Sequence, residues 1–316
     1  MTKKTKSVAA GFGLLLTAMI WGFAFVVVKN SLNTMPPIYM LAIRFSIAVL
    51  GLCLVFHKKL KQINLELIKM GAIPGAILFL GFMTQTIGCQ YTTAGKNAFL
   101  TAVYVVMVPF FNFMINRQKP DKFSVAAGFV AIVGIGLISL NGNLSINVGD
   151  VLTLICGVFF AIHIVFIERY ITDNDPIVLV IIQMATAGLL SWLTAPVFEG
   201  SFPVEVFDLK MVASMLYLSI FSTMVAYLLQ TIGQKYTPAP ITALLLSMEA
   251  VFGVVFSAIF LKEIITIKMF FGCAILLFAI VMAETKFDFI RRVVGSCGKK
   301  HALSSEQGTS QKKRSK

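Results

Sequence analysis

Residues 85–94 read QTIGCQYTTA, and residues 230–239 read QTIGQKYTPA. The two stretches are identical at seven of ten positions and lie 145 residues apart, which is more agreement than chance gives even in apolar sequence. A weaker echo with a spacing of 139 residues relates Pro37 to Pro176. These repeats predict that the chain folds as two related halves.

Both halves are dominated by apolar runs. Of the 316 residues, 58% are hydrophobic and 13% are charged, whereas soluble domains contain about 45–50% apolar and about 25% charged residues. The runs are unbroken, unlike the alternating segments of a transmembrane barrel. The composition therefore predicts an all-α polytopic membrane protein.

Ten of these runs approach the roughly 20 residues that a helix needs to cross a bilayer. The first is too long for the apolar part of a signal peptide, so we expect it to be the first span. The runs cover 8–29, 37–56, 70–89, 94–115, 122–140, 149–169, 176–197, 210–232, 238–261 and 267–285. The expected units are a cytoplasmic N-tail at 1–7, a five-helix repeat at 8–140, a linker at 141–148, a second five-helix repeat at 149–285 and a basic, disordered cytoplasmic tail at 286–316.

The distribution of Lys and Arg predicts the orientation, because cytoplasmic loops carry the excess of these residues. With the N-terminus in the cytoplasm, 21 of them lie on the cytoplasmic side and five on the outer side. Both termini are therefore expected inside. The same loops and tail carry the net charge of +13, which indicates anionic lipids at the cytoplasmic face as partners and no nucleic acid.

Five spans in each half is an odd number, so the two halves must enter the membrane from opposite sides. Inverted repeats are typical of secondary transporters, whose solute site lies near the bilayer midplane where the repeats meet. The expected fold is thus ten transmembrane helices arranged as two inverted five-helix repeats.

Specific motifs extend this interpretation. The run from Tyr91 to Tyr104 (YTTAGKNAFLTAVY) resembles the fourth-helix signature of the drug/metabolite transporter superfamily, EamA-like family. Residues 236–272 are similar to that family's ninth and tenth helices, and Trp21 and Arg44 also match it. One departure is Ala250, where members usually carry a proline that kinks the helix. The resemblance implies a central cavity between the halves and export or exchange of small organic metabolites.

Motifs for enzymatic chemistry are absent from the sequence. There is no GxxxxGK[ST] loop for ATP and no HExxH metal motif, and the five cysteines form an odd set without a CxxC pair. We expect no enzyme activity, no cofactor and no metal. A small-molecule solute is the expected partner, and a bacterial cytoplasmic membrane is the expected location.

Two charged residues inside spans are candidates for the cavity, because a charge in the bilayer costs at least about 2.5–3.5 kcal/mol. Glu249 lies midway through its span, where a low dielectric favours the neutral form. It could carry a proton, or it could be a hydrogen-bonded structural residue at the repeat interface. Arg44, replaced by Gln183 in the second half, could bind a carboxylate or phosphate, or it could snorkel to the membrane surface.

Aromatic, amide and imidazole groups complete the set of cavity candidates, because solute sites combine apolar walls with a few polar groups. A proton relay from His163 to Glu249 and a packing role for His163 both remain open. The amides could instead join helices to one another. The full set is Trp21, Arg44, Gln85, Tyr104, His163, Tyr227, Gln230 and Glu249.

Charged residues near the ends of spans are interpreted as solvated. Lys96 opens the fourth span, and Lys262 and Glu263 occupy the connection between the last two spans. We expect an exposed lysine at the first position and a solvated ion pair at the second.

The expected function is secondary active transport that exports or exchanges a small organic metabolite, an amino acid or a related solute, by alternating access, with proton coupling through Glu249 as a hypothesis. An uncoupled facilitator of the same fold is the main alternative. A membrane-embedded enzyme would need convergent catalytic groups, and a non-transporting sensor or assembly subunit would need a soluble output domain. The sequence offers neither, and it leaves the solute, the direction and the oligomeric state open.

Overall fold

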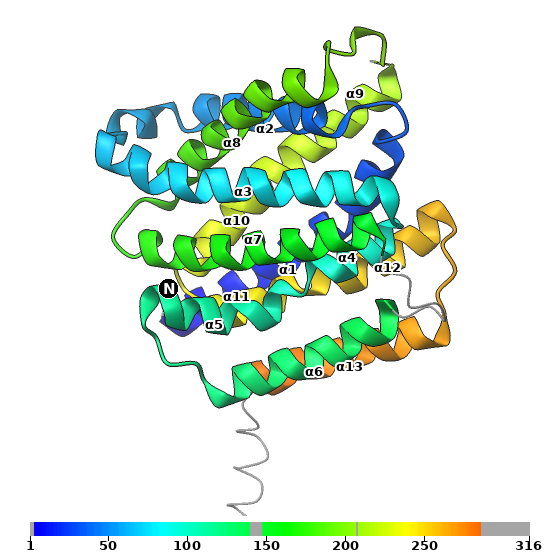
Figure 1. The fold of residues 1–316 in the computed structure, drawn as a ribbon. Helices are drawn as coiled ribbons and strands as arrows, with labels where there is room; N and C mark the ends of the chain where they lie inside the picture. The colour runs from blue at the N-terminus through cyan, green and yellow to red at the C-terminus, as the bar shows by residue number, and fades with distance from the viewer. Residues whose placement is uncertain (1–2, 140–146, 207, 286–316) are drawn as a thin grey trace, which may run out of the picture.

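A computed structural model describes residues 3–139, 147–206 and 208–285. These residues form helices and connecting turns, with no strand among them (Figure 1). The predicted tail at 286–316 and most of the predicted linker at 141–148 lie outside the described residues. Helix α1 begins at Lys3, so the end of the predicted N-tail is already helical.

The helical elements follow the predicted runs closely. In the first half they are α1 (Lys3–Ser31), α2 (Pro37–Val55), the 3-10 helix η1 (His57–Gln62), α3 (Leu65–Tyr91), α4 (Ala94–Thr101), α5 (Tyr104–Asn116) and α6 (Lys122–Ser139). In the second half they are α7 (Val148–Ile171), α8 (Pro176–Glu199), the 3-10 helix η2 (Val204–Val206), α9 (Leu209–Leu216), the π-helix η3 (Tyr217–Val225), α10 (Ala226–Gln234), α11 (Ala239–Leu246), α12 (Met248–Leu261) and α13 (Ile267–Thr285).

Eight helical segments of the described chain are long and apolar enough to cross a membrane. In three of them a span is assembled from consecutive helical elements: α4 with α5, α9 with η3 and α10, and α11 with α12. Helices α6 and α13 contain the shorter apolar stretches Val125–Gly134 and Phe270–Ala279. The chain therefore has the fold of a polytopic helical membrane protein, while ten spans in two repeats stay a prediction.

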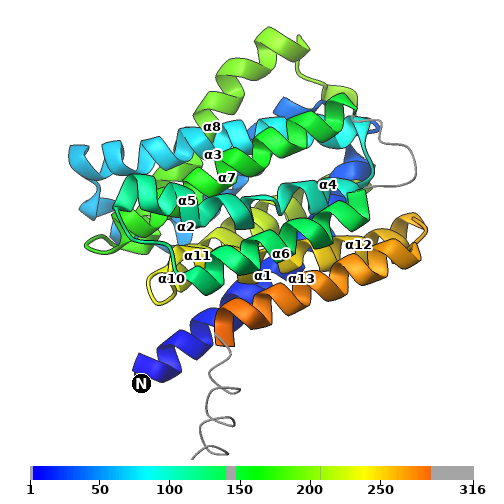
Figure 2. The ribbon, with the colours of Figure 1, turned by 60° about the horizontal axis from the view of Figure 1, so that its bottom comes forward.

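The two halves interleave instead of forming separate bundles. Helix α3 packs against α7 and α8, α2 against α8, and α1 against α10 and α12, so these contacts all join one half to the other. Helices α6 and α13 form a pair of their own along one side of the molecule (Figures 1 and 2). The core between the halves is thus built from helices of both.

Glycines allow the closest approaches between the halves. A Cβ on Gly149 would lie 2.6 Å from the carbonyl oxygen of Gly88, where α7 crosses the end of α3. A Cβ on Gly22 would lie 2.4 Å from the Cβ of Phe252, where α1 crosses α12. Small residues at such crossings let helices pack in a membrane, where no hydrophobic force draws them together.

Two helices are interrupted at equivalent places. Helix α4 ends before Ala102, and α11 ends before Ser247, each after eight residues. These two interruptions are 145 residues apart, as are the repeated motifs. The second interruption lies three residues before Ala250, so the helix is interrupted there although position 250 is not a proline. Interrupted helices frequently form solute sites in transporters.

Candidate functional site

A cavity lies between the two halves, beside both interruptions. Its lining side chains come from α1, α2, α3, α4, α5, α7, η3, α10, α11 and α12. The empty space in and around the cavity is about 570 Å³. Side chains narrow it, so that the centre of a water-sized molecule fits into only about 40 Å³ of this space. The cavity is therefore narrow in this conformation and must widen to admit an organic solute.

The structure places all eight sequence candidates around this one cavity. These candidates are polar or aromatic residues within apolar runs, and they gather where helices of both halves meet. Binding of a solute by these residues stays a prediction. The candidates are Trp21, Arg44, Gln85, Tyr104, His163, Tyr227, Gln230 and Glu249.

Arg44 is buried, with 3% of its surface exposed, and does not reach the membrane surface. Its Nε donates to Thr223 Oγ1 at 2.5 Å, and its Nη2 donates to Ser222 Oγ at 2.9 Å. Its guanidinium carbon lies 4.3 Å from the centre of the Phe82 ring, close enough for a cation–π interaction. Nη1 has no hydrogen-bond partner in the described part of the chain, so this nitrogen remains free to bind a ligand.

Glu249 lies in the first turn of α12, just after the interruption, and is 3% exposed. The described residues provide no ion pair for its carboxyl group. The Tyr104 hydroxyl is near enough to interact with it, but the geometry falls short of a hydrogen bond and leaves that hydroxyl unpartnered. Arg44 and Glu249 therefore contribute a basic and an acidic group to one cavity, and no ion pair joins them among the described residues.

Repeat-related residues line the same cavity. Gln85 and Gln230 are repeat partners, and the same spacing of 145 residues relates Tyr104 to Glu249. Gln85 Nε2 donates to Thr101 Oγ1 at 3.1 Å, so it joins helices α3 and α4 as the alternative interpretation expected. Gln230 Oε1 and Tyr104 Oη are buried without a protein partner. These two oxygens can accept hydrogen bonds from a ligand.

Aromatic rings form one wall of the cavity. The Tyr227 ring centre lies 5.1 Å from that of Trp21, 6.0 Å from Phe82 and 5.9 Å from His163. Phe82 and Phe160 also line the cavity but were not singled out from the sequence, because nothing distinguishes them among 28 phenylalanines. An apolar or aromatic group of a ligand would pack against this wall.

His163 bonds to an amide instead of to Glu249. Its Nε2 lies 2.8 Å from Gln183 Oε1, and both residues are buried. The described residues show no hydrogen bond between His163 and Glu249, so a relay between them lacks a direct contact. Gln183 is the repeat partner of Arg44, so the two equivalent positions of α2 and α8 have taken different roles.

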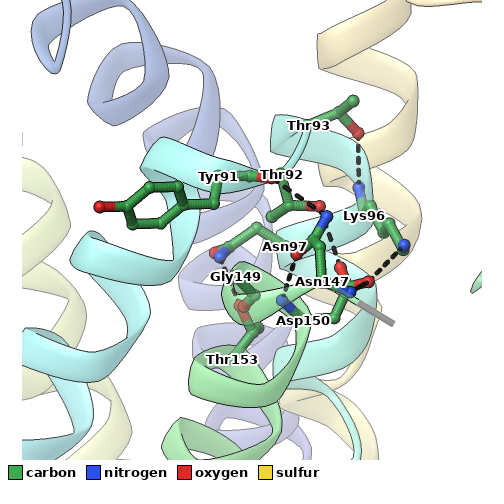
Figure 3. Close-up of polar contacts among 9 residues, drawn as sticks. All are labelled: Tyr91, Thr92, Thr93, Lys96, Asn97, Asn147, Gly149, Asp150 and Thr153. Carbon is green, nitrogen blue, oxygen red and sulfur yellow. Dashed lines mark hydrogen bonds and ion pairs between the residues drawn. The ribbon is translucent and has the colours of Figure 1, made fainter. Parts of the chain in front are cut away.

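Asn97 lines the cavity and was missed by the sequence interpretation. Its Nδ2 donates to Thr153 Oγ1 at 2.9 Å, while its Oδ1 is buried without a partner (Figure 3). The neighbouring Lys96 was expected to be solvated, but its Nζ contacts Asp150 Oδ2 at 2.7 Å, and Asp150 is only 5% exposed. The polar run Lys96-Asn97 in an apolar span was the signal that could have identified both residues.

Glu263 also departs from the expectation of a solvated ion pair with Lys262. Its two carboxylate oxygens accept from the backbone N–H groups of Ala94 and Gly95 at 3.1 and 3.2 Å. It therefore caps the N-terminus of α4 from the other half of the chain, where the helix dipole favours an anion.

A buried, partly polar cavity between two interleaved halves of a helical membrane protein, beside two interrupted helices, is the arrangement of a membrane transporter. Sequence comparison assigns the family. The chain belongs to the EamA-like transporter family, whose model matches residues 9–140 and again 147–285. It is thus an integral membrane protein of a transporter family.

Individual relatives agree with this assignment. A protein of Archaeoglobus fulgidus named "Uncharacterized transporter" is 34% identical over 281 residues, which are 89% of this chain and 87% of that protein. A protein of Escherichia coli K12 named "Probable amino-acid metabolite efflux pump" is 23% identical, covering 83% of this chain and 90% of its own length. A solved crystal structure that is 14% identical has the same fold, with a TM-score of 0.68 and coverage of 89% of this chain and 98% of that one.

Proposed function

We propose that this chain is a secondary transporter that exports or exchanges a small zwitterionic metabolite, an amino acid or a related solute. The observation that carries the proposal is that a basic group, Arg44, and an acidic group, Glu249, share one buried cavity without an ion pair for either among the described residues. Isolated charges in a low-dielectric interior are costly. A solute with one negative and one positive group would compensate both.

The available contacts suggest how such a solute would lie. Its carboxylate binds Nη1 of Arg44, because the remaining nitrogens of the guanidinium are already occupied. Its ammonium group binds the Glu249 carboxylate and the unpartnered oxygens of Gln230 and Tyr104. Its side chain packs against the rings of Trp21, Tyr227 and Phe82. The name of the Escherichia coli relative supports this class of solute.

We further propose that the chain forms ten transmembrane helices in two inverted repeats, at 8–140 and 149–285, with both termini in the cytoplasm of a bacterial cell. Equivalent contacts support this arrangement, since α1 packs on α12 as α7 packs on α5, and α3 packs on α7 as α10 packs on α1. Motion of the repeats about the cavity would expose it alternately to the two sides.

The proposal also includes proton coupling through Glu249. A carboxyl group that lacks an ion-pair partner can gain and lose a proton as the cavity opens to one side and then the other. Glu249→Gln keeps an oxygen that can accept from the ammonium group but loses the charge, so it is expected to weaken solute exchange without abolishing it and to lose accumulation driven by a pH gradient. Accumulation at the wild-type rate would rule out the coupling role and favour an uncoupled facilitator.

The test of the function is counterflow in proteoliposomes loaded with pooled amino acids, sugars, nucleosides and polyamines, read out by mass spectrometry. We expect selective exchange of amino acids and weaker exchange of their decarboxylated amines and their carboxamides. Arg44→Gln, which copies the residue of the second half, should reduce this preference. Exchange of sugars or nucleosides alone, or no exchange by folded protein, would overturn the proposal.

A further inference from the structure

The π-helix η3 is an unusual element at the edge of the cavity. It interrupts the helical run from α9 to α10 with nine residues of i→i+5 hydrogen bonding. Such wide turns are uncommon and occur frequently at functional sites, because they leave backbone groups unpaired within the helix. Here the carbonyl oxygen of Ser222 accepts from Trp21 Nε1 at 2.9 Å and from Arg44 Nη2 at 3.3 Å.

Thr223 is oriented by the same π-helical geometry. Its hydroxyl donates to the carbonyl oxygen of Leu218, five residues earlier, at 2.7 Å. A hydroxyl group has a single proton, so this bond directs its lone pairs elsewhere, and one of them accepts from Arg44 Nε. The hydroxyl is therefore a fixed acceptor for the guanidinium.

The partners of Arg44 hold it without removing its charge. Thr223 Oγ1, Ser222 Oγ and Ser222 O are neutral acceptors, and no carboxylate of the described residues forms an ion pair with Arg44. Together with the Phe82 ring they fix one edge and one face of the guanidinium. The free Nη1 and the positive charge remain for a ligand.

We infer that Ser222 and Thr223, presented by η3, are positioning residues that make the transporter selective for solutes with a carboxylate. The inference rests on the proposed function. A guanidinium that is free to rotate loses entropy when it binds an anion, whereas a fixed one does not. The selectivity therefore depends on the two hydroxyls of η3 as well as on Arg44.

The test compares Thr223→Val with Thr223→Ser. Counterflow is measured for an amino acid and for the amine that results from its decarboxylation. In Thr223→Val the KM for the amino acid should rise about tenfold, in line with the loss of a hydrogen bond to a charged group, while the KM for the amine stays unchanged. Thr223→Ser keeps the acceptor and should restore the wild-type ratio.

Ser219→Ala is the matched control. Ser219 is buried in the same π-helix and donates to the carbonyl oxygen of Met215 at 2.6 Å, but it forms no hydrogen bond with Arg44. Its removal should leave the ratio of the two KM values unchanged. If Thr223→Val impairs amino acid and amine equally, or if Thr223→Ser fails to restore the ratio, Thr223 merely joins α2 to η3 and the inference is wrong. If the wild-type protein exchanges no amino acid, the proposed function fails instead.

Discussion

The two ends of the molecule differ in how firmly the two halves of the chain are joined there. Each has a short helix, α4 at one end and α11 at the other, whose N-terminus needs a capping group. At the α4 end the cap is Glu263, which belongs to the opposite half. At the α11 end it is Glu168 of the same half, whose Oε1 accepts from Ala239 N at 2.9 Å.

Ion pairs between the halves show the same contrast. At the α4 end Lys96 pairs with Asp150, and these side chains are 26% and 5% exposed, so the carboxylate of this pair is buried (Figure 3). At the α11 end Lys59 pairs with Asp175, and these side chains are 36% and 24% exposed. Breaking a buried pair costs about 3–5 kcal/mol, whereas an exposed pair contributes about 0–1 kcal/mol.

Apart from this ion pair, the hydrogen bonds between the halves at the α11 end have long donor–acceptor distances. Asn116 Nδ2 lies 3.4 Å from Glu168 Oε2, and Arg169 Nη1 lies 3.4 Å from the carbonyl oxygen of Ile115. The more buried ion pair and the shorter hydrogen bonds indicate that the halves are held together more firmly at the α4 end. Under the proposed alternating access, we therefore expect the cavity to open more easily at the α11 end, which the proposed orientation places in the cytoplasm.

The largest effect is expected from breaking the buried ion pair. Asp150→Ala removes the partner of Lys96 and the acidic residue of the capping box at the start of α7, so stability should fall by about 3 kcal/mol. Thermal unfolding in detergent measures it. Asp175→Ala is the matched variant at the other end, because it also removes an ion-pair partner and a helix cap, here of α8, and it should cost about 1 kcal/mol. Equal losses would show that the two ends are held equally.

An intermediate effect is expected from removing the cap that joins the halves. Cys89 lines the cavity near the α4 end and is 1% exposed, so it can report opening in a chain that lacks the other cysteines. Glu263→Ala should raise the rate at which an impermeant maleimide labels Cys89 about tenfold, as the loss of two charge-assisted hydrogen bonds allows. The rate is measured in intact cells and in inside-out vesicles.

Glu168→Ala is the counterpart for the cap at the α11 end. Because Glu168 caps a helix of its own half, its removal should change the labelling of Cys89 less than the removal of Glu263 does. If Glu168→Ala raised the labelling rate more than Glu263→Ala, the halves would be held more firmly at the α11 end.

The smallest effect is a pH dependence at the exposed pair. Burial alone would raise the pKa of Asp175, but the hydrogen bond from Lys59 and the N–H groups at the start of α8 outweigh it and lower that pKa. The stabilisation is therefore complete above the ordinary aspartate pKa of about 3.9 and is lost as the pH falls through the lowered value. Asp175→Asn should be slightly less stable than wild type at pH 7, and this difference in melting temperature should shrink as the pH falls below the ordinary aspartate pKa. A constant difference would mean that the charge of Asp175 plays no part.

Much of the fold followed from local properties of the sequence. The length and polarity of the apolar runs predicted each helical region, because crossing a bilayer imposes a minimum length on a helix. The spacing of 145 residues also related α4 to α11 and Tyr104 to Glu249, although the second pair was recognised only in the structure. The π-helix η3 had no signal, since Tyr217–Val225 contains neither glycine nor proline.

The sequence by itself determined that this protein is a helical membrane protein with a repeated unit and polar residues within its spans. The tertiary structure alone decided which of these residues meet: Arg44 with Thr223, Lys96 with Asp150, and Glu263 with the start of α4. The physical reason is that hydropathy and spacing act along the chain. The choice of a hydrogen-bond partner depends instead on how helices far apart in sequence pack, and there a buried polar atom bonds to whichever group packing brings within reach.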